Sequence, residues 1–112
     1  MEKEGGRYEA ALVWLRRALE LDPRSGVLRF QLGELEYHRG MLDEARTHLE
    51  QAIELLPEFA DAQHLLAFVL GDLGEDAAAA EAAARARELN PALSRAETNL
   101  SLDHYNPARY GE

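Results

Sequence analysis

Four histidines are the side chains of this sequence best suited to metal or proton chemistry: His38, His48, His64 and His104. Imidazole binds transition metals and exchanges protons near neutral pH. No two of them are four residues apart, the spacing that aims two imidazoles at one metal from a single helix. His38, His64 and His104 could approach one another across neighbouring helices, but surface imidazoles are the more economical expectation. We therefore expect no metal and no cofactor.

Three carboxylates, Glu20, Glu54 and Glu88, recur at intervals of 34 residues and resemble a catalytic set at first sight. Their even spread favours capping or inter-repeat contacts instead. The sequence has no Cys, which excludes disulfides, thiolate metal sites and a Cys nucleophile. It also shows no glycine-rich phosphate loop and no nucleophile elbow. We expect a protein without catalytic residues.

The composition indicates one small, helical and acidic unit. The 112 residues include 12 basic and 21 acidic ones, a net charge of −9, which disfavours binding to a phosphate backbone. No apolar run approaches the roughly 20 residues of a membrane span, and the first residues lack the pattern of a secretory signal. We expect a cytoplasmic protein that binds neither nucleic acid nor membrane. Ala and Leu far outnumber Val, Ile and Thr, which predicts an all-α fold.

The sequence repeats itself at an interval of 34 residues. Seven columns are identical in three copies, and they begin at Gly6, Ala11, Ala18, Glu20, Leu21, Pro23 and Leu32. Such a period predicts stacked copies of one supersecondary unit. Each unit contains two stretches with apolar residues at helical spacing, such as 27–39 and 42–56. Gly40 suits the left-handed residue that ends a helix, and Pro57 cannot continue one.

One further column holds only small residues: Gly33, Ala67 and Ser101. A small residue there lets the first helix of a pair approach the second, where Ala45 and Ala52 offer shallow surface. In the third unit the second helix, 76–89, is rich in alanine. Alanine favours the helix but buries little apolar area, so we expect this helix to pack weakly.

The period and the small residues resemble the tetratricopeptide repeat family, whose unit is a 34-residue helical hairpin. The match is best in Leu32-Gly33, Gly40, Ala45 and Ala52. The resemblance implies a single right-handed solenoid of about two and a half repeats over 1–105. Its parts are the second helix of a partial repeat (7–25), full repeats at 26–59 and 60–93, a capping helix (94–105) and a tail (106–112).

The resemblance also implies a concave groove lined by the first helices, with an apolar and partly aromatic floor. Its expected residues are Phe30, Gln31, Glu34, Tyr37, His38, His64, Leu65, Phe68, Asp72, Arg95, Asn99, Leu102 and Tyr105. Such a groove suits a protein or peptide segment. Because residues 26–59 and 60–93 each sum to a charge of −4, an apolar or mildly basic segment is the better ligand. The same residues could also simply fill the spaces between helices.

The half repeat at the start of the array leaves one helix without its partner. Its apolar residues are candidates for self-association: Tyr8, Leu12, Trp14, Leu15 and Leu19. The alternative to a peptide-binding module is therefore a structural self-assembly unit, a homodimer or higher oligomer, in which another copy fills this helix or the groove.

Overall fold

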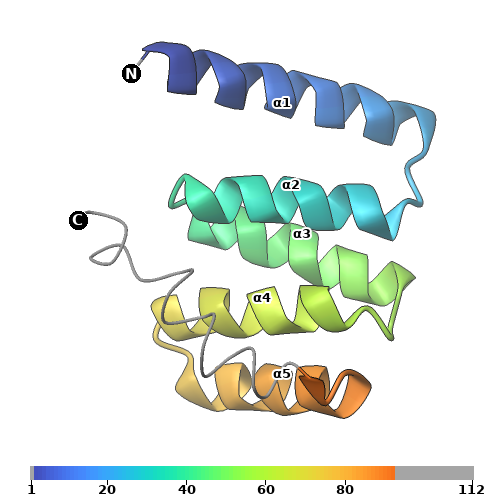
Figure 1. Cartoon of the computed structure of the whole chain (residues 1–112), viewed down its shortest axis with the longest axis vertical. Helices are drawn as coiled ribbons and strands as arrows, with labels where there is room; N and C mark the ends of the chain where they lie inside the picture. The colour runs from blue at the N-terminus through green and yellow to red at the C-terminus, as the bar shows by residue number, and fades with distance from the viewer. Residues whose placement is uncertain (1, 93–112) are drawn as a thin grey trace.

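The computed structural model describes residues 2–92, which form five α-helices joined by short turns (Figure 1). The helices are α1 (Glu2–Leu21), α2 (Gly26–His38), α3 (Leu42–Leu55), α4 (Ala60–Asp72) and α5 (Asp76–Leu89). Helices α2, α3 and α5 lie within one residue of the stretches that the sequence predicts. The difference is α1, which begins five residues before the expected start and runs through Gly5 and Gly6. The predicted capping helix and tail lie outside the described residues.

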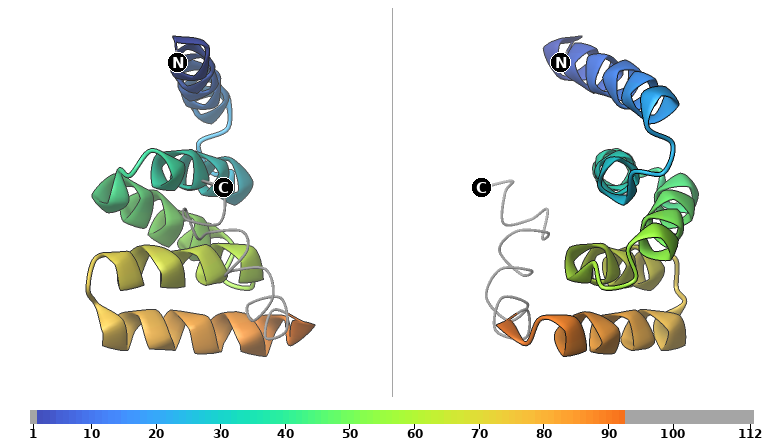
Figure 2. Two further views of the ribbon diagram at one scale, coloured as in Figure 1. Left: turned by 60° about the vertical axis from the view of Figure 1, so that its left-hand side comes forward. Right: turned by 90° about the vertical axis from the view of Figure 1, so that its right-hand side faces the viewer.

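The helices pair into hairpins that stack along the molecule. The closest contacts join α2 to α3 and α4 to α5, and looser contacts join α3 to α4 and α1 to α2. In Figure 2 (right), α2 and α4 lie on one side of α3, so the two first helices face the same side of the array. This arrangement confirms the predicted all-α solenoid of helical hairpins.

Two glycines make the tight turns inside the hairpins. Gly40 and Gly74 have φ of +78° and +85°, a left-handed conformation that costs glycine little. After Gly40, the Met41 amide donates a hydrogen bond to the carbonyl oxygen of Glu36, and Glu75 does the same to Leu70 after Gly74. These bonds satisfy carbonyls that would otherwise be orphaned at the helix ends. The predicted helix-ending role of Gly40 is confirmed.

The core runs along the seam between the paired helices. Its buried members are Ala45, Leu49, Ala52, Ala62, Leu65, Leu66, Val69, Leu70 and Ala82. At Gly33 an added Cβ would lie 2.9 Å from Leu49 Cγ and 3.3 Å from the Ala45 carbonyl oxygen. Because Gly33 has no side chain, α2 packs close against α3 at this point, which confirms the predicted role of the small residue.

Candidate functional site

The expected groove residues on α2 divide into packed and open ones. Phe30 and Tyr37 are half-buried and pack against the core, and the Phe30 ring lies 4.9 Å from that of Phe59. Gln31 and His38 are exposed. The remaining one, Glu34, is half-buried. Helix α2 thus presents a short aromatic ridge with polar residues beside it.

On α4 the expected residues fall into three different environments. His64 and Phe68 are half-buried, and their rings meet edge to face with centroids 5.1 Å apart. Asp72 is exposed near the end of the helix. Leu65 retains only 3% of its surface and belongs to the core, so it does not form part of an open groove floor. Helix packing accounts for this difference, because Leu65 lies on the face of α4 that carries buried Ala62 and Val69, three residues before it and four after it.

Spacing places the half-buried residues of the two helices on one side of the array. Phe30 and His64 are one period apart, and so are Glu34 and Phe68. The other four expected residues, Arg95, Asn99, Leu102 and Tyr105, lie outside the described part of the chain.

An apolar hollow of about 530 Å³ lies at the turn between α3 and α4, next to the start of α2. Its lining is Val27, Leu56, Pro57, Glu58 and Phe59. Val27 and Leu56 are 48% and 39% exposed. Since Phe59 also contacts Phe30, the hollow continues the aromatic ridge of α2. Sequence reasoning missed Leu56 and Phe59, although large apolar residues on both sides of Pro57 were a signal, because turns usually carry polar residues.

The self-association candidates on α1 do not share one environment. Tyr8 and Leu15 are buried within the chain, while Leu12 and Leu19 are half-buried. The Tyr8 hydroxyl lies 3.0 Å from Met41 Sδ, and the Arg39 guanidinium sits 4.4 Å from the Tyr8 ring centroid. Only Trp14 is strongly exposed, at 61%. Helix α1 therefore docks on the array through Tyr8, Leu12, Leu15 and Leu19, and Trp14 faces outward.

A buried carboxylate joins the two helices of the first complete hairpin. Glu36 is 3% exposed, and its Oε1 lies 2.7 Å from His48 Nδ1. Leu19, Arg16 and Glu20 of α1 close a polar hollow of about 400 Å³ over this pair. Sequence reasoning did not pair His48 with Glu36. The missed signal was spacing, because Glu36 follows buried Leu32 by four residues and His48 follows buried Ala45 by three.

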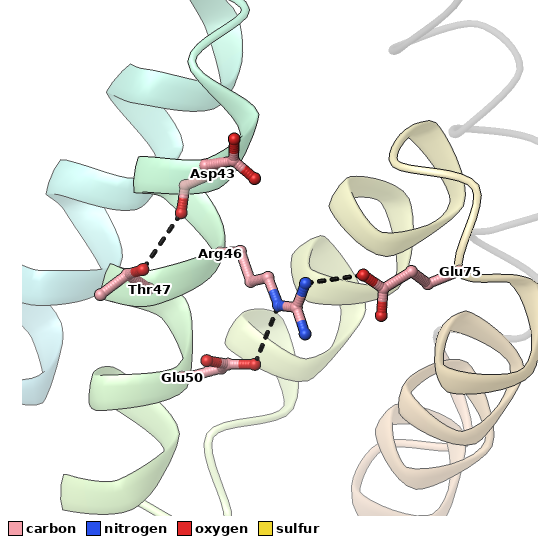
Figure 3. Close-up of polar contacts among 5 residues, drawn as sticks. All are labelled: Asp43, Arg46, Thr47, Glu50 and Glu75. Carbon is pink, nitrogen blue, oxygen red and sulfur yellow. Dashed lines mark hydrogen bonds and ion pairs between the residues drawn. The ribbon is translucent and has the colours of Figure 1, made fainter.

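The link between successive hairpins is an arginine rather than the repeated carboxylates (Figure 3). Arg46 of α3 lies 2.7 Å from Glu75, which precedes α5, and 3.3 Å from Glu50 on its own helix. The hydrogen bond to Glu50 raises the pKa of Arg46 above its ordinary value, and the hydrogen bond to Glu75 raises it further. Among the repeated carboxylates, Glu88 pairs with Arg85 within α5. In the described part, these carboxylates form no hydrogen bond or ion pair with another repeat.

The described residues show two further chemical features of the chain. No group of three or more His, Asp or Glu side chains in this part could hold a metal ion. Among the described helices, none combines the length and the hydropathy that a membrane crossing requires.

An array of 34-residue helical hairpins with glycine turns and small contact residues defines a class of helical repeat proteins. The tetratricopeptide repeat family model matches residues 4–67, and the chain belongs to the tetratricopeptide repeat family. No curated protein sequence matches this chain significantly.

Solved structures of the same fold include two informative neighbours. The crystal structure of MamA superposes with a TM-score of 0.76 at 25% identity, and the match covers 96% of this chain and 63% of MamA. YrrB, described as a tetratricopeptide repeat protein with an unusual peptide-binding site, superposes with a TM-score of 0.70 at 30% identity. That match covers 79% of this chain and 45% of YrrB. This chain thus spans less than two thirds of either neighbour.

Proposed function

We propose that this chain is a non-catalytic interaction module that binds a peptide or protein segment across α2 and α4. The observation that carries the proposal is the set of half-buried aromatic rings on the two first helices: Phe30, Tyr37, His64 and Phe68. Partly exposed aromatic residues on rigid helices are typical anchors of protein interfaces. Membership of a family of helical scaffolds and the likeness to YrrB, a peptide-binding protein, support the same function.

The charges beside the aromatic ridge favour an apolar or mildly basic ligand. Glu34, Asp61 and Asp72 lie along α2 and α4, and the complete repeats carry a net charge of −4 each. Acidic residues at the edge of a site attract basic partners and repel acidic ones. The apolar hollow beside Phe59 offers space for one large apolar side chain of the ligand.

A selection experiment with charge variants tests this function. A phage-displayed random peptide library is selected on the intact chain, and the recovered peptides are measured by fluorescence anisotropy. We expect apolar peptides with Lys or Arg. Phe68→Glu should weaken their binding at least about 30-fold, the loss of roughly 2 kcal/mol that follows removal of a central aromatic contact.

A second variant guards against misfolding of Phe68→Glu. Gln31→Arg adds a positive charge at an exposed position of α2 and should weaken basic peptides, while Ala84→Arg on the exposed side of α5 is the matched control. Circular dichroism reports whether each variant keeps its helices. Unchanged binding by Phe68→Glu and Gln31→Arg, with both folded, would remove α2 and α4 from the binding site.

The second candidate function is self-assembly through α1, which the exposure of Trp14 favours. The burial of Tyr8 and Leu15 inside the chain leaves this surface smaller than the sequence suggests. Sedimentation velocity over a dilution series separates the two functions. A self-assembly unit gives a dimer that dissociates on dilution, whereas a peptide-binding module stays monomeric.

A further inference from the structure

The turn between α3 and α4 carries large apolar residues where the preceding turn of the repeat carries polar ones. Leu56 directly precedes Pro57, and Phe59 follows this proline by two residues. One period earlier, in the turn between α1 and α2, the same two positions hold Asp22 and Ser25. Both turns lie at the same end of the array, on the right of Figure 1. The two turns thus have one place in the repeat but different chemistry.

The polar residues of the other proline turns bind the backbone. Ser25 Oγ accepts a hydrogen bond of 3.1 Å from the Leu28 amide at the start of α2. Asn90, which follows α5, accepts one of 3.1 Å from the Ala92 amide. Phe59 stands at the cap of α4 and makes no hydrogen bond there with its side chain. Because a hydrogen-bonded cap stabilises a helix, the turn between α3 and α4 lacks a contact that a polar residue would supply.

Part of the apolar surface of this turn remains open to solvent. The Phe59 ring is half-buried and lies 4.9 Å from the Phe30 ring, so packing within the chain accounts for it. Val27 and Leu56 are exposed instead, and they line the apolar hollow of about 530 Å³ described above. An open hollow of this size with an apolar lining is typical of a surface that contacts another molecule.

The charge beside the hollow is negative. Glu58 is the charged residue among the described residues that line it. Its side chain is exposed and forms no hydrogen bond or ion pair with the described part of the chain. Asp61, in the first turn of α4, is also exposed. A basic group of a ligand therefore meets an available carboxylate next to apolar surface, whereas an acidic group is repelled.

We propose that the apolar hollow holds the anchor of the peptide ligand, which is one large apolar side chain with Lys or Arg as its direct neighbour in the ligand sequence. Val27 and Leu56 contact the apolar side chain, and Glu58 pairs with the basic one. Since Phe59 joins the hollow to Phe30, one extended segment reaches both the hollow and the aromatic ridge. This inference rests on the proposed binding of a peptide across α2 and α4, and it specifies which ligand residues are selected.

The neighbouring repeats supply variants that should keep the fold. The next repeat has Asp61 at the position of Val27, and the previous repeat has Arg24 at the position of Glu58. Val27→Asp and Glu58→Arg therefore introduce residues that the same place in the repeat already accepts. Val27→Asp also adds an acidic residue to the first turn of α2, which has none. Circular dichroism should show native helix content for both variants.

The probes are the peptides that the phage library yields on the intact chain, and copies of them in which Glu replaces the Lys or Arg. We expect the peptides to share a Leu, Ile, Phe or Trp next to a Lys or Arg. Val27→Asp should weaken their binding at least about tenfold. Glu58→Arg should weaken it about two- to fivefold, and it should bind the Glu copies more tightly than the native chain does. Glu81→Arg, the same charge reversal at an exposed position of α5, is the matched control and should leave the affinity unchanged.

The anchor and the proposed function fail separately in this experiment. If Phe68→Glu abolishes binding while Val27→Asp and Glu58→Arg bind as the native chain does, the groove stands and the anchor is overturned. If Val27→Asp and Glu58→Arg weaken binding but Phe68→Glu does not, the anchor is supported and the groove across α2 and α4 is overturned. Recovery of no peptide overturns both.

Methyl NMR of Val27 and Leu56 in the full chain identifies the occupant of the hollow. Addition of a selected peptide should shift the signals of these methyl groups. Contacts of the same methyl groups with residues 93–112 in the absence of peptide would overturn the proposal, because the chain then fills its own hollow. A change of the signals on dilution of the protein would also overturn it, because a second copy is then the occupant.

Discussion

His48 Nδ1 of α3 lies 2.7 Å from Glu36 Oε1 of α2, and this contact satisfies a carboxylate that is 3% exposed. The pair connects the two helices of the first complete hairpin beneath Arg16, Leu19 and Glu20 of α1. A buried polar group is costly only when its partner is missing. The stability of this hairpin should therefore depend on His48 more than on any exposed ion pair.

Replacing His48 tests that dependence. His48→Ala leaves Glu36 without its partner, and we expect a loss of about 1–3 kcal/mol in the free energy of unfolding, measured by urea denaturation. His48→Gln retains a hydrogen-bond donor and should lose less. Equal stability of His48→Ala and the native chain would show that water replaces the imidazole without cost.

Two glycine substitutions of identical chemistry should have opposite effects. At Gly33 of α2 a Cβ meets Leu49, a fully buried side chain, at 2.9 Å, so Gly33→Ala should destabilise the chain by about 1–3 kcal/mol. At Gly71 of α4 a Cβ meets nothing within 4 Å. Gly71→Ala should then stabilise by about 0.5–1 kcal/mol, the usual gain in a helix. Thermal unfolding of both variants measures the difference, and the same sign for both would contradict the close contact at Gly33.

Hydrogen exchange should distinguish the second helices of the two complete hairpins. Helix α5 buries only Ala82 and Ala86, and it has half-buried Ala83 where α3 has fully buried Leu49. Because α5 buries less apolar area, residues 76–89 should exchange amide hydrogens faster than residues 42–55. Mass spectrometry of exchanged peptides gives the comparison. Equal or greater protection of 76–89 would refute the weak packing of α5.

The link between hairpins through Arg46 should be weak and sensitive to salt. Arg46 and Glu75 remain partly exposed, with 35% and 44% of their side-chain surface accessible. Exposed ion pairs contribute little and are screened by salt. Arg46→Gln should therefore destabilise the chain less than His48→Ala, and the difference from the native chain should shrink in about 1 M salt. A loss that persists in high salt would instead indicate that the Arg46 side chain acts through packing.

The expected groove residues show how much of a site a sequence resemblance can predict. Four of the expected groove residues lie half-buried on the first helices: Phe30, Tyr37, His64 and Phe68. Leu65 is buried instead, because the period and the spacing place a residue on a helix but do not predict how closely the neighbouring helix covers it. The hollow beside Phe59 was missed for a related reason, since its residues come from helix α2 and from the turn between α3 and α4, which only the fold brings together.

The sequence alone determined the period, the positions of the helices and the glycine turns, because these follow from local preferences of the backbone and from the spacing of small and apolar residues. Tertiary structure decided which side chains are covered. It paired Glu36 with His48, buried Tyr8 and Leu15 against the array, and left Trp14 exposed. Burial depends on the distance and orientation of neighbouring helices, and that information resides in the packing of the whole chain.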